Sequence, residues 1–118
     1  MRNTGLDKRI YKPRYIDVTK RIEFHADQLA ALGHAARLAI LRHVVQAGAE
    51  GSTATELQTQ LDIPWTTLNH HLDRLVASSL VTARREGKFV HNTANYDALK
   101  TLTDFLWEDC CKRGKSCC

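Results

Sequence analysis

The chain has 118 residues, of which 43% are hydrophobic and 25% charged, and this composition is typical of one small globular domain. No run of residues approaches the roughly 18 apolar positions that a membrane-spanning helix requires, and charges occupy the N-terminus where a signal peptide needs an apolar stretch. These features predict a cytosolic protein with a single core. A core of this size is modest, so we expect a homodimer interface to add to its stability.

The net charge of +4 is unevenly distributed along the chain. Residues 1–21 carry seven Lys and Arg residues against Asp7 and Asp17, so they hold +5, and residues 22–118 hold −1. The high isoelectric point is therefore no evidence that the folded domain binds nucleic acid. We expect residues 1–21 to be a basic, solvated and partly disordered arm, and a path along DNA phosphates is the alternative.

Two amphipathic helices are predicted after this arm. The first begins at residue 22 and has apolar side chains at helical spacing, namely Ile22, Ala26, Leu29 and Leu32. Gly33 ends it. The second helix covers residues 35–47, and its predicted buried stripe comprises Leu38, Leu41 and Val45, with Ile40 and Val44 beside them. Gly48 and Gly51 then form a turn.

Two further helices follow, separated by a tight turn. Thr53 or Ser52 is a suitable N-cap for the third helix, Glu56 completes a capping box with Thr53, and the helix ends near Leu61. Pro64 is expected in the first turn of the fourth helix, where its missing N–H costs nothing. The predicted buried stripe of that helix comprises Leu68, Leu72, Leu75 and Val76. Its opposite face presents Thr66, Asn69, His70 and Asp73.

The chain ends with a predicted hairpin and a last helix. Between residues 80 and 93, β-favouring residues stand on both sides of Glu86-Gly87, which indicates a β-hairpin. The last helix, about residues 95–112, is too apolar to be left in water on so small a domain. We expect it to pack against a second subunit, with an interface formed by Leu29, Leu99, Leu102 and Leu106.

This order of elements describes a winged helix-turn-helix: mainly α, with a small β-hairpin before the fifth helix. The fourth helix is then the one that enters the major groove of DNA. The side chains expected to reach base edges or phosphates are Thr66, Thr67, Asn69 and His70. Those expected on the flanking DNA backbone are Arg84, Arg85 and Lys88. Taken singly, each of these residues also suits a polar helix face or a solvated hairpin tip.

Three segments resemble the ArsR/SmtB family of metal-sensing repressors: Leu29-Ala-Ala-Leu-Gly-His-Ala-Ala-Arg-Leu-Ala-Ile-Leu41, Asn69-His-His-Leu72, and the stretch from Leu80-Val to Arg84-Arg-Glu-Gly-Lys88. The resemblance covers roughly residues 24–108. It implies a homodimer with the first and last helices at the interface, binding to operator DNA, control of a resistance operon, and release from the operator when an inducer binds. It implies no enzymatic activity.

Several positions depart from the family pattern. Residues 55–61 lack the cysteine pair that the family's arsenic sensors carry on the third helix. Tyr96, Ala98, Asp109 and Lys112 stand where the family's zinc and nickel sensors place Asp and His ligands, so this set cannot bind zinc in that way. Pro64 replaces a frequent Ser, and Trp65 occupies a position that is often polar. The base preference of other members therefore cannot be transferred.

All four cysteines lie at the C-terminus, at Cys110, Cys111, Cys117 and Cys118. In a reducing cytosol such a cluster indicates metal binding or redox chemistry before structural disulfides. If the last helix continued, Cys111 and Cys117 would lie about 9 Å apart along its axis, so the helix must stop, and Gly114 suits a stop. The chain can then bring Cys117 to the first pair. Three thiolates suit As(III) or Sb(III), and Cys118 is a spare or a fourth ligand.

The predicted mechanism is that inducer binding reshapes the end of the interface helix and shifts a two-state dimer away from its DNA-competent form. One alternative is a thiol redox switch, in which a disulfide links the pair at 110/111 to the pair at 117/118. Another is a constitutive DNA-binding module with a passive metal-binding tail. An enzyme is least favoured, because no base, phosphate cradle or substrate pocket is evident. The six histidines are expected to cap, pack or contact phosphate.

Overall fold

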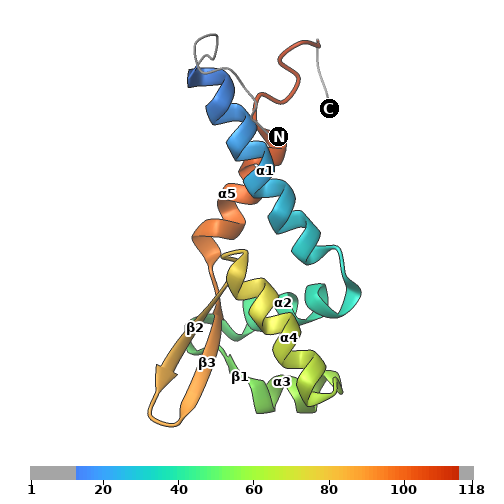
Figure 1. Cartoon of the computed structure of the whole chain (residues 1–118), viewed down its shortest axis with the longest axis vertical. Helices are drawn as coiled ribbons and strands as arrows, with labels where there is room; N and C mark the ends of the chain where they lie inside the picture. The colour runs from blue at the N-terminus through green and yellow to red at the C-terminus, as the bar shows by residue number, and fades with distance from the viewer. Residues whose placement is uncertain (1–12, 115–118) are drawn as a thin grey trace.

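The computed structural model describes residues 13–114, with side chains described from residue 19 onward. Its helices and strands follow in the order α1 (Pro13–Leu32), α2 (Ala35–Ala47), η1 (Gly48–Glu50), β1 (Ser52–Thr53), α3 (Ala54–Leu61), α4 (Trp65–Ala77), β2 (Val81–Glu86), β3 (Phe89–Ala94) and α5 (Tyr96–Trp107). α1 and α5 lie together at one end of the molecule, and α2, α3, α4 and the hairpin form the other (Figure 1). The predicted winged helix-turn-helix is confirmed.

The first helix is longer than predicted. α1 begins at Pro13 rather than at residue 22, so residues 13–21 of the expected arm are helical. Proline is favourable in a first helical turn because its N–H would be unpaired there anyway, and Lys and Arg are good helix formers. The remainder of the predicted arm, residues 1–12, lies outside the described residues.

A single core forms where α2, α3, α4 and the sheet meet. Its fully buried side chains include Ile40, Val44, Leu57, Leu68, Leu75 and Leu80. Two side chains predicted in the buried stripes are instead substantially exposed, Leu38 at 44% and Val76 at 39%. In α2 the side that packs against α4 and β3 carries Ile40, Leu41 and Val44, so Leu38 falls on the solvent side.

The hairpin pairs β2 with β3 from Val81↔Ala94 to Glu86↔Phe89, and Gly87 at φ +63° provides the left-handed residue of the turn. β1 adds to the other edge of β3, through Ser52↔Asn92. This strand could not be predicted, because two residues are too few to show an alternating pattern. The buried Asn92 amide donates to the Ser52 carbonyl at 3.1 Å, which reinforces the pairing.

The predicted capping box of α3 is confirmed. The Thr53 hydroxyl accepts from the Glu56 backbone N–H at 3.2 Å, and the Glu56 carboxylate accepts from the Thr53 N–H at 2.8 Å. Pro64 is the N-cap of α4 rather than a residue of its first turn, with an extended ψ of 144°. The helix therefore begins at Trp65 and not one residue earlier.

The last helix is shorter than predicted, because α5 ends at Trp107 and not near residue 112. Glu108 is its C-cap, and Asp109 and Cys111 have φ values of +58° and +63°. Left-handed residues cannot continue a right-handed helix, so the chain turns before either of the first two cysteines. The expected stop at Gly114 is therefore wrong. No helix within residues 13–114 is long and apolar enough to span a bilayer.

Candidate nucleic-acid interface

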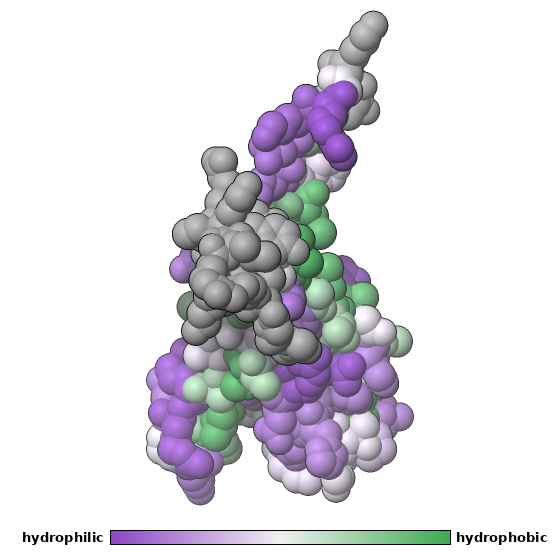
Figure 2. All heavy atoms as spheres, turned by 45° about the horizontal axis from the view of Figure 1, so that its top comes forward, coloured by the Kyte–Doolittle hydropathy of each residue, from purple (hydrophilic) through white to green (hydrophobic). Residues whose placement is uncertain are grey.

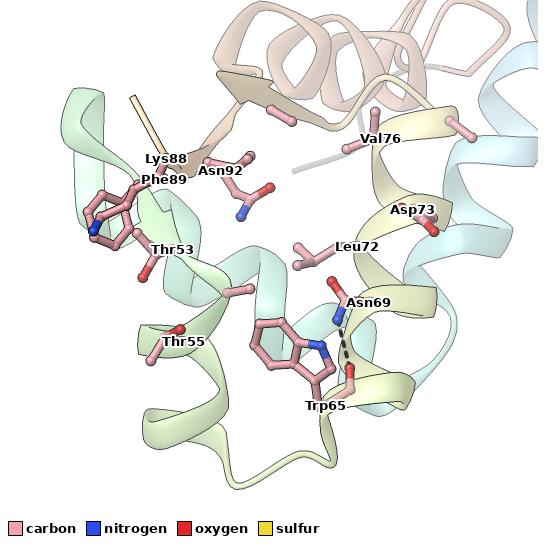
Figure 3. Close-up of a pocket in the computed structure, with 14 residues that line it drawn as sticks. Thr53, Thr55, Trp65, Asn69, Leu72, Asp73, Val76, Lys88, Phe89 and Asn92 are labelled. Carbon is pink, nitrogen blue, oxygen red and sulfur yellow. Dashed lines mark hydrogen bonds between the residues drawn. The ribbon is translucent and has the colours of Figure 1, made fainter. Parts of the chain in front are cut away.

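The outer face of α4 presents the polar side chains that the sequence predicted. Thr66, Thr67 and His70 are exposed, and Asn69 is half-buried. The Asn69 amide nitrogen donates to the Trp65 carbonyl at 3.0 Å, which holds the side chain along the helix and leaves its oxygen available to accept (Figure 3). Leu68, Leu72 and Leu75 on the opposite face are buried in the core, so the polar face of α4 points outward.

His71, unlike its neighbour His70, does not belong to this outer face. Its side chain is buried, with its ring 4.7 Å from the ring of His34 and its Nδ1 3.4 Å from Nη1 of Arg37. Burial, followed by the nearby charges of His34, Arg37 and His70, lowers the pKa of His71. His34 caps α2, since its Nδ1 accepts from the Ala36 N–H, so the expected capping role for a histidine is confirmed.

The hairpin carries its three predicted cations on exposed positions, Arg84, Arg85 and Lys88. Arg84 is partly engaged, because its Nε lies 3.4 Å from a Glu86 carboxylate oxygen and its Nη1 donates to the Ala49 carbonyl at 3.4 Å. Residues two apart on a strand share a face, so this pairing was readable from the sequence. The charge of Arg84 is thus partly compensated within the hairpin.

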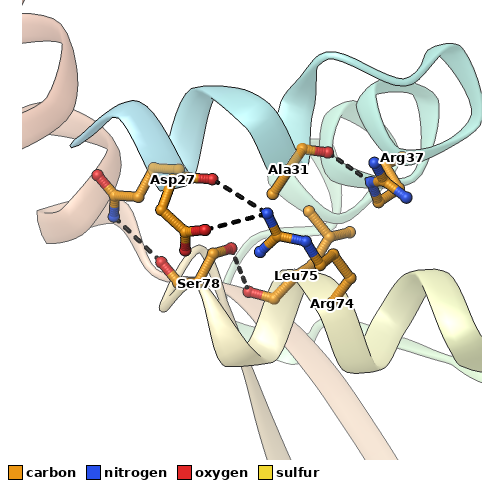
Figure 4. Close-up of polar contacts among 7 residues, drawn as sticks. Asp27, Ala31, Arg37, Arg74, Leu75 and Ser78 are labelled. Carbon is orange, nitrogen blue, oxygen red and sulfur yellow. Dashed lines mark hydrogen bonds and ion pairs between the residues drawn. The ribbon is translucent and has the colours of Figure 1, made fainter. Parts of the chain in front are cut away.

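Polar contacts fix α4 relative to α1. Arg74 of α4 donates to both the carbonyl and the carboxylate of Asp27, at 3.4 Å and 3.1 Å (Figure 4). The buried Gln28 amide donates to the carbonyl of Ser78, the C-cap of α4, at 3.2 Å. Its oxygen lies 2.9 Å from Nδ1 of His25. These contacts tie α1 to the end of α4.

Apolar side chains remain exposed at the end of the molecule formed by α1 and α5. Leu29 is 41% exposed, Leu106 58% and Trp107 69%. Figure 2 shows hydrophobic surface beside the hydrophilic turn that follows α5. Leu102, predicted at a dimer interface, is only 2% exposed within the single chain, and Leu99 packs against the same core. Leu102 therefore belongs to the protomer's own core and offers almost no surface to a second subunit.

The turn after α5 places two cysteines together. Cys110 is exposed, Cys111 is half-buried, and their sulphur atoms lie 3.3 Å apart. Cys111 is disulfide-bonded. Within residues 13–114 no group of three or more His, Cys, Asp or Glu side chains is arranged to hold a metal ion. Cys117 and Cys118 lie outside the described residues, so the predicted three-thiolate site stays a prediction.

The same turn is tied to α1. Glu108 accepts from both terminal nitrogens of Arg21, at 2.6 Å and 3.2 Å, and this hydrogen bonding lowers the pKa of the Glu108 carboxyl. The Arg21 guanidinium also lies 5.1 Å from the ring centre of Phe105, and the His25 ring lies 4.4 Å from that same ring. The residues flanking the cysteines thus contact the helix that contacts α4.

Comparison with known proteins gives a consistent result. A helix-turn-helix domain model matches residues 32–84. No curated protein gives a significant match to the chain. Among solved structures, an ArsR-like transcriptional regulator from Rhodococcus sp. RHA1 is 25% identical, with a TM-score of 0.67 over 74% of this chain and 79% of that one.

Two other solved structures are similar over more of the chain. The transcriptional repressor BigR from Xylella fastidiosa is 28% identical over 82% of this chain and 96% of that one, with a TM-score of 0.59. The homodimeric winged helix-turn-helix domain of Mb0332 from Mycobacterium bovis, described as a possible ArsR-family regulator, is 20% identical over 92% and 97%, with a TM-score of 0.63. The chain therefore contains a helix-turn-helix domain, and it shares its winged fold with solved structures of ArsR-family transcriptional regulators.

Proposed function

We propose that the chain is a transcriptional repressor that binds operator DNA as a homodimer. The observation that carries this proposal is the juxtaposition of the polar outer face of α4 with the cationic hairpin. α4 has the width that the major groove accepts, and Asn69 has a donor and an acceptor of the kind that read adenine. Arg85 and Lys88 supply charge for the DNA backbone beside it.

Binding of labelled DNA from upstream of the chain's own gene tests this proposal by fluorescence anisotropy. We expect Asn69→Ala to weaken binding by roughly ten- to a hundred-fold, the loss of one good base contact. Lys88→Ala weakens binding at all sequences and reduces the slope of log K against log salt concentration by about 1. Lys100→Ala is the matched control, because Lys100 is an exposed cation of α5 that pairs with Asp104. Unchanged binding by both Asn69→Ala and Lys88→Ala would contradict the assignment of these residues to the DNA-binding surface.

The dimer is proposed to form through α1 and α5. The exposed Leu29, Leu106 and Trp107 support this, since large apolar side chains in water mark interaction surfaces. The homodimeric state of the Mb0332 domain, which has the same fold, points in the same direction. Leu106→Glu should yield monomers in sedimentation equilibrium, whereas Leu38→Glu, at an exposed position of α2, should leave dimers intact.

The inducer is proposed to be As(III) or Sb(III), bound by the reduced thiolates of Cys110, Cys111 and Cys117, with Cys118 as a spare or fourth ligand. The 3.3 Å approach of the first two sulphur atoms supports a shared ligand, and soft thiolates suit these thiophilic ions. Reduction of Cys111 must come first, because a disulfide sulphur is no thiolate ligand. Binding would reshape the turn beside Glu108 and, through Arg21, bias α1 and the dimer.

Serine variants test this inducer site. Cys110→Ser, Cys111→Ser and Cys117→Ser should each bind DNA with the affinity of the unaltered reduced chain and fail to release it on addition of arsenite. Ser116→Ala is the matched control in the same segment and should still release. Loss of DNA binding by all three serine variants would count against a sensing role for the cysteines.

A thiol redox switch is the second candidate, and the disulfide bond of Cys111 is the observation that favours it. In this reading two thiols lose two protons and two electrons to form the S–S bond, and hydrogen peroxide is reduced to two water molecules. Peroxide would then release DNA in a step that dithiothreitol reverses, and arsenite would have no effect of its own. Parallel titrations of the reduced complex distinguish the two candidates.

A further inference from the structure

A cleft of about 560 Å³ runs between α4 and the hairpin. α4 contributes Trp65, Asn69 and Val76 to its walls, and the hairpin contributes Lys88 and Phe89 (Figure 3). The indole of Trp65 extends from the start of α4 toward α3, below Leu72 in the view of Figure 3. Thr53, Ala54 and Thr55, in β1 and at the start of α3, complete the lining. Two of the elements that build the cleft therefore also carry the proposed DNA contacts.

Large apolar side chains in this cleft remain in water. Trp65 is 49% exposed, Phe89 is 55% exposed and Val76 is 39% exposed. The rings come from opposite walls, one at the start of α4 and the other at the start of β3. Concentrated apolar exposure of this kind marks an interaction surface, because leaving it in water has a free-energy cost that a bound partner removes.

The position of the cleft argues for DNA as its occupant. When a helix lies in the major groove and a neighbouring hairpin contacts the DNA backbone, one strand of the duplex must pass between them. Asn69 and Lys88 line the cleft and also belong to the proposed DNA surface, so the two surfaces are continuous. A pocket for a small molecule would instead bury most of its ligand, whereas both rings here stay half exposed.

The charges of the cleft set the orientation of that strand. Lys88 on the hairpin wall attracts phosphate, with its ammonium 6.0 Å from the Phe89 ring centre. Asp73 on the α4 wall repels phosphate. A sugar–phosphate strand therefore fits with phosphate toward the hairpin and its apolar deoxyribose faces toward the rings.

We propose that the cleft holds one sugar–phosphate strand of bound DNA, with Trp65 and Phe89 packing against deoxyribose and Lys88 facing a phosphate. This inference rests on the proposed DNA binding and adds two apolar determinants of affinity to it. Because sugars are the same at every base pair, these contacts strengthen binding to all sequences equally and provide no base discrimination.

The chain has only two tryptophans, Trp65 and Trp107, and this allows a direct test. In a Trp107→Phe variant, Trp65 is the sole indole and reports on the cleft. We expect its emission to change as duplex DNA is added, with the same midpoint as the anisotropy of the labelled DNA. The change should occur with the upstream duplex and with a random-sequence duplex. In the matched Trp65→Phe variant, the emission of Trp107 should stay constant through the same titration.

Affinity measurements complete the test. Trp65→Ala and Phe89→Ala should each bind roughly ten-fold more weakly to both duplexes, the loss expected from the half of an aromatic side chain that binding buries. The salt slope should not change, in contrast to Lys88→Ala. Leu38→Ala removes an equally exposed apolar side chain outside the cleft and should bind normally.

The outcomes separate this inference from the proposed function. If anisotropy rises while Trp65 emission stays constant, DNA binds but the cleft is empty, and the inference is overturned alone. A loss confined to the upstream duplex would overturn the assignment to the sugar–phosphate strand and make these residues base readers. If neither duplex binds the unaltered chain at low salt, the proposed function fails and the inference fails with it.

Discussion

At the scale of single residues, Gly51 is a position where the close approach of β3 leaves no room for a side chain. It has φ +72°, and a Cβ built there would lie 2.5 Å from the Asn92 carbonyl oxygen of β3. Gly48 has a similar φ of +69° but nothing within 4 Å of its Cβ position. We therefore expect Gly48→Ala to lower the free energy of unfolding by about 1 kcal/mol, and Gly51→Ala by at least about 1 kcal/mol more.

Urea unfolding of the two variants at equal chain concentration measures this difference. Equal losses would mean that β3 yields to the added methyl group and that the β1–β3 pairing does not hold the backbone at this point.

His71 predicts a pH dependence of stability. Because its pKa is lowered in the folded chain, the unfolded chain binds more protons below the ordinary histidine value of about 6.5. The contribution of neutral His71 to the free energy of unfolding is therefore fully present above a pH of about 6.5. It is lost as the pH falls from there toward the lowered pKa of the folded chain. The groups that face His71 are His34 and Arg37, with His70 adjacent on α4.

We expect the urea midpoint of the unaltered chain to fall between pH 7 and pH 5, and that of His71→Gln to fall less over the same range. His43→Gln, at a position of α2 remote from this cluster, is the control for the loss of a histidine. A steeper fall for His71→Gln would contradict the sign of the shift.

At the scale of elements, Gln28 links α1 to the end of α4 from a buried position. Gln28→Leu leaves the Ser78 carbonyl and the His25 ring without this partner, so we expect a loss of about 1–3 kcal/mol in the free energy of unfolding. Asp27→Ala removes only an exposed ion pair with Arg74 and should cost less than about 1 kcal/mol. Comparable losses in the two variants would show that the buried link is not the main contact.

Most helix boundaries could be predicted because their signals are local. Apolar spacing together with the Thr53–Glu56 capping box located α2 and α3. The end of α5 could not be predicted, because the left-handed turn at Asp109 and Cys111 uses no glycine. The burial of Leu102 was also missed, since an apolar stripe indicates that a face is covered and not which partner covers it.

The candidate nucleic-acid interface could be predicted in part, because its exposed side chains also follow from local sequence patterns. Polar residues on one side of α4 and cations at the hairpin follow from helical and strand periodicity, and the structure leaves them exposed. The cleft depends on how α4 and the hairpin approach each other in space. The sequence therefore could not show that Trp65 and Phe89 line the same cleft. The geometry of the cysteine site depends on residues beyond Gly114 and remains a prediction.

At the scale of the whole molecule, the contacts form one continuous connection. The cysteine turn is tied to α1 through Glu108 and Arg21, α1 is tied to the end of α4 through Gln28 and Asp27, and α4 presents the proposed DNA-reading face. A ligand of the thiols can shift DNA affinity only if it binds the free and DNA-bound forms differently. We therefore expect a coupling free energy between the thiol site and the DNA-binding face of at least about a few kcal/mol if DNA is to be released.

The most direct test is the anisotropy of labelled upstream DNA bound to the reduced chain, measured as arsenite is added. We expect a complex of two chains per duplex that dissociates as arsenite binds, while zinc at the same concentration leaves it intact. If the complex persists when arsenite has saturated the thiols, arsenite is not the inducer, and the chain is a DNA-binding protein with no metalloid response.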